Sequence, residues 1–158
     1  MKKLRLFTDG SIHTQSNIGY GAFLLVENES LPIETLKTKV TTKRFENTTS
    51  TKLELQILLW ALNEIPPTSQ QLIIYTDSQN IIGLPARRNR LEQNDFHTSK
   101  NQLLRNHKLY QAFYQLLDKL NFELVKIKGH LPTKEKDRMA QLFSLVDKAA
   151  RKALRTEI

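Results

Sequence analysis

The sequence predicts an α/β domain, in which helices pack against a sheet. Strand-like and helix-like segments follow one another as three strands, a helix, a strand, a helical region, a strand and a closing helix. This order of elements is typical of one domain in which helices form layers on a sheet. The length of 158 residues suits one domain rather than two, and a hydrophobic fraction of 39% indicates a packed core rather than disorder.

The periodicity of hydrophobic residues, together with the turn residues that interrupt it, predicts the strands and helices in order. The strands are expected at residues 3–8, 20–26, 35–44, 72–76 and 122–127. The third of these is the most polar, alternating in Thr and Lys, and is expected to be the most exposed. Helices are expected at residues 53–65, 109–120 and 142–154, the first of them stopped by two prolines at 66–67.

Composition narrows the classes of function. The absence of cysteine excludes disulfides and thiolate metal sites and fits a reducing compartment. No segment approaches the roughly 18 apolar residues of a membrane span, and the amino terminus has no signal-peptide core. We therefore expect a cytoplasmic protein without membrane contact. Lys and Arg number 24 against 16 Asp and Glu, and this net charge of +8 favours a polyanionic partner, nucleic acid ahead of membrane.

One carboxylate pattern occurs twice. Asp9 and Asp77 each follow an apolar strand and a Thr, and each precedes small or polar turn residues. Open α/β sheets bind ligands at the carboxyl ends of their strands, so two such strands lying parallel would bring both carboxylates to one edge. The alternative is that each Asp only closes its strand with an Asx-turn. A matched pair favours a functional site.

Glu54 lies in a predicted helix that is apolar on nearly every face. A carboxylate in such surroundings costs several kcal/mol unless it meets a cation or strong donors. The alternative is a favourable interaction with the helix dipole in the first turn. Asp147 is a fourth candidate, just before Ala149 and Ala150 in the closing helix, although alone it is better explained as a surface acid paired with the basic residues that follow.

Four carboxylates without thiols suit hard cations, namely Mg²⁺ or Mn²⁺. Two such ions about 4 Å apart can activate a water, orient a phosphate and stabilise the leaving oxygen. Converging acids repel one another, so such a site is strained until a cation relieves it. Acids at the metals and basic residues elsewhere are typical of an enzyme that cuts phosphodiesters.

Five segments, in order and at nearly the expected spacing, resemble the type I branch of the ribonuclease H family. They are Phe7-Thr8-Asp9-Gly10-Ser11, Gly19-Tyr20-Gly21-Ala22, Thr48-Thr49-Ser50-Thr51-Lys52-Leu53-Glu54, Tyr75-Thr76-Asp77-Ser78-Gln79 and Val125-Lys126-Ile127-Lys128-Gly129-His130. The resemblance implies a single catalytic domain over residues 1–158, with a mixed five-stranded sheet and helices on both faces. It implies an endonuclease that cuts the RNA strand of RNA–DNA hybrids with two Mg²⁺ ions, or with Mn²⁺. Nothing in the sequence demands more than a monomer.

The resemblance also assigns roles. Asp9, Glu54, Asp77 and Asp147 would bind metal, and His130 would assist proton transfer or product release, as an imidazole that titrates near neutrality can. Without the resemblance, His130 is better explained as a turn residue that follows a strand.

The interval between His130 and Asp147 is longer than in well-known members, which suggests a divergent subgroup. Asp137 is an alternative acid within it, although Asp147 fits the family pattern better.

The resemblance implies some of the family's contacts to nucleic acid, but not all of them. Gln79 matches a minor-groove position, where 2′-hydroxyls distinguish RNA from DNA. Ser50 and Thr51 stand where the family usually has two Asn residues, Thr49 matches a phosphate contact, and Asn17 is a candidate ribose contact.

Residues 83–108 occupy the place of the family's basic protrusion, and a solvated basic loop is the alternative explanation. The basic residues expected to grip the hybrid there are Arg87, Arg88, Arg90 and Lys100.

Three other functions remain open from the sequence. A related enzyme of the same superfamily would use the same acids on DNA. A lapsed binding module would be expected to lack an acid, yet all four are present. An adaptor domain would leave Glu54 unexplained.

Overall fold

The computed structural model describes residues 3–66, 68, 70–128 and 137–158. Its centre is a five-stranded mixed sheet in the order β3-β2-β1-β4-β5, which confirms the expected fold class. β1 pairs antiparallel with β2 and parallel with β4, β2 pairs antiparallel with β3, and β4 pairs parallel with β5. The strands are β1 (Lys3–His13), β2 (Ile18–Val26), β3 (Thr41–Phe45), β4 (Gln71–Thr76) and β5 (Phe122–Lys126).

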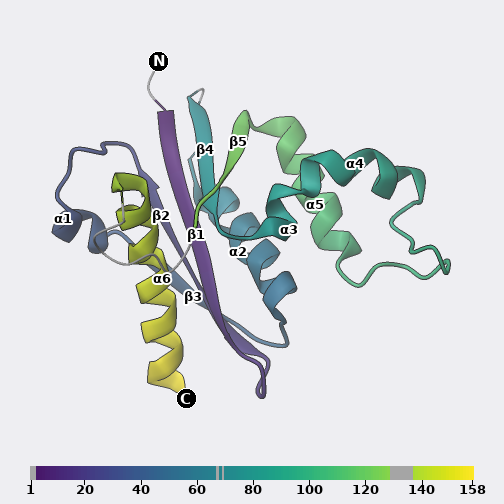
Figure 1. The fold of residues 1–158 in the computed structure, drawn as a ribbon, viewed down its shortest axis with the longest axis horizontal. Coiled ribbons are helices and arrows are strands. Elements are labelled where there is room, and N and C mark those ends of the chain that lie inside the picture. Colours follow the sequence, from purple (N-terminus) through teal and green to yellow (C-terminus); the bar gives the residue numbers. More distant parts are fainter. Residues whose placement is uncertain (1–2, 67, 69, 129–136) are drawn as a thin grey trace.

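Helices cover both faces of this sheet, as Figure 1 shows. α2 packs on one face with α5 beside it, and α6 packs on the other face against β1, β2 and β3. The helices are α1 (Ile33–Lys37), α2 (Ser50–Glu64), α3 (Gln79–Ile82), α4 (Leu84–Gln93), α5 (His107–Lys119) and α6 (Arg138–Glu157). In the described part of the chain, no helix is both long and apolar enough to cross a membrane.

Alternation along β1 decides which face each side chain enters. Leu4 and Leu6 join the buried cluster formed with α2 and α5. Phe7 joins the separate cluster formed with α6, where it stacks on Tyr75 with ring centroids 4.6 Å apart. Asp9 is two residues beyond Phe7, so the same alternation directs its side chain towards α6.

The register between β1 and β4 leaves one edge of β1 uncovered. Their pairing ends at Phe7 with Tyr75, although β1 continues to His13. From Thr8 onwards β1 therefore has no β4 neighbour. This open edge lies at the carboxyl end of both parallel strands, where Asp9 and Asp77 were expected to meet.

Glycines let α2 approach this end of the sheet closely. Gly10 and Gly21 are cross-strand neighbours. A Cβ atom at Gly21 would lie 2.3 Å from Ile57 Cγ1, and one at Gly10 would lie 2.5 Å from Ile57 Cδ1. The packing of α2 that places Glu54 thus depends on the absence of side chains beneath Ile57.

The prediction of one strand over residues 35–44 is wrong in its first half. Residues 35–37 belong to α1, and only 41–45 form the exposed edge strand β3. Pro32, with φ −60°, precedes this helix, and Leu36 anchors it by complete burial. A single buried anchor in a five-residue helix leaves too little periodicity to outweigh the Thr and Lys alternation.

We expect Gly21→Ala to lower the free energy of unfolding by about 1–3 kcal/mol, because the added methyl overpacks against Ile57. Gly83→Ala is the matched control, since its Cβ would lie 3.5 Å from the nearest atom, Gln79 O, at an ordinary φ of −82°. Urea denaturation of both variants measures the difference. Equal stability of the two variants would contradict the close packing of α2.

Candidate metal and nucleic-acid site

Three of the four predicted carboxylates line one small pocket at the open edge of β1. Asp9 comes from β1, Asp77 directly follows β4, and Glu54 comes from the first turns of α2. Their meeting follows from the parallel pairing of β1 and β4 and from the close packing of α2. Residues about 70 positions apart in sequence therefore share one site.

Ser78 holds Glu54 in place, a role that the sequence pattern did not reveal. Its hydroxyl donates a hydrogen bond of 2.5 Å to Glu54 Oε2. The Ser78 hydroxyl oxygen also accepts a hydrogen bond from the amide of Ile81 and so caps α3. Burial raises the pKa of Glu54, the Ser78 hydrogen bond opposes this increase, and the charge of Asp77 adds to it. The signal available in the sequence was only the presence of a Ser directly after Asp77.

Asp9 and Asp147 form the second half of the site. Burial first, and then the charge of Asp77, raise the pKa of Asp9 to about 8. The charge of Asp147 and a side-chain interaction with its carboxyl raise this pKa further, so Asp147 lies close to Asp9. Arg151 lies one helical turn along α6 and pairs with Asp147 at 3.0 Å.

These contacts distinguish Asp147 from Asp137. Asp137 is exposed, and its Oδ1 accepts a hydrogen bond of 2.8 Å from the amide of Ala140, so it caps α6. Much of the interval that looked like a lengthened loop is thus the first turns of this helix. His130 lies outside the described residues, so its place relative to the carboxylates is a prediction only.

The four side chains are all carboxylates, which are the ligands that a hard divalent cation prefers. Their like charges repel one another, and a bound cation would relieve that repulsion. Among the described residues, no group of three or more His, Asp or Glu side chains stands in an arrangement that could hold a metal ion as it is. A cation would therefore have to draw these carboxylates together. The raised pKa of Asp9 is the electrostatic cost that such a cation would remove.

The predicted minor-groove and phosphate contacts surround the start of α2. Thr49 is the N-cap of α2, and Ser50 and Thr51 are exposed in its first turn. The turn between β1 and β2 lies beside them, since the carbonyl of Asn17 accepts from the amide of Thr48 at 3.0 Å. Asn17 has φ 56°, a conformation that Asn tolerates better than most residues.

Gln79 is exposed at the start of α3, and Lys126 Nζ donates a hydrogen bond of 2.7 Å to its Oε1.

The basic residues of the protrusion differ in their partners. Arg88 donates to both oxygens of Asp118 at 2.6 and 2.8 Å and also pairs with Glu92. Arg87 donates to the backbone and side-chain oxygens of Asn80 at 2.9 and 2.8 Å. Arg90 and Lys100 are exposed. The latter two are thus better placed to reach a polyanion.

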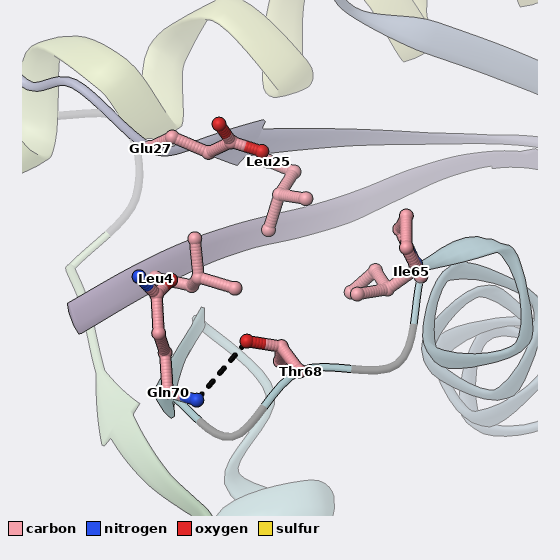
Figure 2. Close-up of a pocket in the computed structure, with 7 residues that line it drawn as sticks. Leu4, Leu25, Glu27, Ile65, Thr68 and Gln70 are labelled. Atoms are coloured by element: carbon pink, nitrogen blue, oxygen red, sulfur yellow. Dashed lines mark hydrogen bonds between the residues drawn. The ribbon is translucent and has the colours of Figure 1, made fainter. Parts of the chain in front are cut away.

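A larger hollow of about 410 Å³ opens at the other end of the sheet. Figure 2 shows Leu4, Leu25 and Ile65 around it, and Gln70 N donates to Thr68 Oγ1 at 3.0 Å. Glu27 is the one charged residue among those that line it. This hollow lacks converging chemical groups, so the site of interest is the carboxylate edge.

The fold and the carboxylate edge together define a hydrolase of the ribonuclease H-like class. The family model described as RNase H matches residues 1–155. Ribonuclease H of Clostridium botulinum strain Hall is 27% identical over 149 residues, which cover 90% of this chain and 93% of that protein. Ribonuclease H of Idiomarina loihiensis is 28% identical over 143 residues, which cover 89% and 85%.

Solved structures share the fold. The solution structure of the PFV RNase H domain matches with a TM-score of 0.74 at 18% identity, covering 96% of this chain and 93% of that one. LC9-RNase H1, described as a type 1 RNase H with the type 2 active-site motif, matches with a TM-score of 0.71 at 16% identity, covering 96% and 72%. The chain belongs to the RNase H family, whose members generally use divalent metal ions.

The raised pKa of Asp9 predicts a pH-dependent stability without metal. In the unfolded chain this carboxyl ionises near pH 4, whereas in the folded protein it keeps its proton to about pH 8. The unfolded state thus loses a proton first, so stability falls as the pH rises between these values. Asp9→Asn should flatten this decline and be more stable than the wild type at the alkaline end, by at least about 1 kcal/mol.

Urea denaturation in EDTA, at about pH 5 and about pH 8, measures this effect, with Asp137→Asn as the control. Mg²⁺ should then stabilise the wild type more than Asp9→Asn. If the wild type has the same free energy of unfolding at both pH values, the pKa of Asp9 is not raised in the folded protein as described.

Proposed function

We propose that this protein is an endonuclease that hydrolyses the RNA strand of RNA–DNA hybrids, using two Mg²⁺ ions or Mn²⁺ in their place. The observation that carries the proposal is the convergence of Asp9, Glu54 and Asp77 on one pocket, with Asp147 close enough to raise the pKa of Asp9. Family membership supports the same activity.

The four carboxylates would hold the metal. Divalent cations in such a site activate a water and neutralise charge on the phosphate. Ser78 keeps Glu54 directed into the pocket through its 2.5 Å hydrogen bond. Arg151 holds Asp147 from the solvent side. His130 would deliver a proton to the leaving oxygen or aid product release.

The proposed hybrid specificity is supported by groups beside the pocket. Gln79, Ser50 and Thr51 present side chains that donate and accept hydrogen bonds, as 2′-hydroxyl recognition requires. Thr49 and Asn17 would contact the backbone of the hybrid, and Arg90 and Lys100 would reach its phosphates from the protrusion. A structural neighbour at 15% identity, the foamy viral protease-reverse transcriptase, has been solved with an RNA/DNA hybrid.

The direct test is hydrolysis of end-labelled substrates in the presence of Mg²⁺ or Mn²⁺. The wild type should cut the RNA of a hybrid in preference to double-stranded DNA or double-stranded RNA, and EDTA should abolish cutting. Asp77→Asn and Asp147→Asn should each lower the rate by at least about 100-fold, because each removes a metal-binding charge.

Asp137→Asn is the matched control for Asp147→Asn, since Asn also caps helices well and Asp137 lies outside the site. It should leave the rate unchanged. Preferential cutting of DNA would overturn the proposed substrate, and loss of activity in Asp137→Asn with retention in Asp147→Asn would overturn the assigned acids.

His130→Ala should slow turnover by about 10- to 100-fold without eliminating it, because the metal-binding carboxylates remain. Steady-state kinetics with and without added imidazole measure this, and imidazole should restore part of kcat. An unchanged kcat would remove His130 from the mechanism.

A further inference from the structure

A basic face runs along the outer side of α6. It consists of Lys148, Arg151, Lys152 and Arg155, whose spacing of i, i+3, i+4 and i+7 places them on one side of the helix. All four are exposed, while Val146, Ala150 and Leu154 on the opposite side are buried against the sheet. We refer to these four residues as the α6 basic face.

No acid within the helix neutralises most of this charge. α6 contains two carboxylates, Asp147 and Glu157. Asp147 is engaged with Asp9 and Arg151, and Glu157 accepts hydrogen bonds from Tyr20 and Arg44. Within the described part of the chain, Lys148, Lys152 and Arg155 form no ion pair. The face therefore presents an uncompensated positive charge to solvent.

Helix stability does not account for the pattern. The helix dipole favours cations in the last turn, which accounts for Arg155 but not for Lys148, more than two turns before the end of α6 at Glu157. Like charges at i, i+3 and i, i+4 repel and cost a few tenths of a kcal/mol for each pair. A polyanion bound along the face would relieve this repulsion.

The position of the face indicates which polyanion it meets. It begins beside Asp147, at the carboxylate site, and runs to the end of the molecule that holds the β1–β2 turn and the start of α2 (Figure 1). The Tyr20 hydroxyl donates a hydrogen bond of 2.7 Å to Glu157 Oε1, and this bond holds that end of the helix on β2. Asn17 and Thr49, the proposed backbone contacts, lie at the same end. The protrusion carrying α4 lies on the other side of β1 (Figure 1).

We infer that the α6 basic face binds phosphates of the nucleic acid beyond the cutting site, on the side opposite the protrusion. The inference rests on the proposed function, because it places a duplex across the carboxylates. From Lys148 to Arg155 the helix rises about 10 Å, which matches about three nucleotides of one strand. Arg87 and Arg88 are held by Asn80 and Asp118 within the protein. Fewer cations of the protrusion are therefore available for phosphates, and the α6 basic face would supply a larger share of the binding.

The test compares two triple variants that each remove three charges. Lys148→Gln/Lys152→Gln/Arg155→Gln alters the α6 basic face and spares Arg151, which touches Asp147. Lys3→Gln/Lys37→Gln/Lys119→Gln alters exposed cations elsewhere. Binding of an RNA–DNA hybrid long enough to extend past both sides of the site is measured in EDTA, between about 50 and 200 mM salt.

The α6 variant should bind about 10- to 100-fold more weakly at the lower salt, and its slope of log affinity against log salt should fall by about 2 to 3, because each phosphate that the protein neutralises contributes about 0.9 to that slope. A charge-retaining variant, Lys148→Arg/Lys152→Arg/Arg155→Lys, should bind like the wild type. Circular dichroism and thermal unfolding confirm that each variant folds.

If the two triple Gln variants lose the same affinity for the hybrid, the loss reflects net charge rather than the position of the α6 basic face, and the inference is overturned. Loss of binding to phosphatidylserine vesicles, with hybrid binding unchanged, would overturn it in favour of a membrane surface. If the wild type cuts hybrids and the α6 variant keeps its affinity and KM, the inference alone fails. If the wild type does not cut hybrids, the proposed function fails as well.

Discussion

The repulsion among carboxylates at the open edge of β1 is the constraint on which the rest of this structure depends. The sheet brings Asp9 and Asp77 together because β1 and β4 are parallel and their pairing stops at Phe7 and Tyr75. The packing of α2 on Gly10 and Gly21 adds Glu54, and α6 adds Asp147. Folding of the large apolar clusters on both faces must overcome this repulsion, which a divalent cation would turn into attraction.

Much of this site could be predicted from sequence because its signals are local. Asp9 and Asp77 each follow a short apolar strand, and Glu54 is a charge in an otherwise apolar helix. The contacts that tune the site are not local. The hydrogen bond from Ser78 to Glu54 and the interaction of Asp147 with Asp9 depend on how α2 and α6 cross the sheet. The helix at residues 33–37 was missed because one buried leucine gives no period.

Charge provides the second lesson. A net charge of +8 indicated a polyanionic partner, but it could not say which cations are available to bind it. Arg87 and Arg88 belong to the predicted basic protrusion, yet both hold partners within the protein, and Arg88 bridges α4 to α5 through Asp118. In the sequence, the cations of α6 indicated only that Asp147 could be an ordinary surface acid. Their common face became evident once the buried side of the helix was known.

The central claim is that four carboxylates, distant in sequence, share divalent cations at one edge of the sheet. Crystals grown or soaked with Mn²⁺ and measured at its absorption edge test this most directly. The account predicts anomalous density between Asp9, Glu54, Asp77 and Asp147, with these side chains drawn closer together. Mn²⁺ bound elsewhere, with these four carboxylates free of it, would contradict the account.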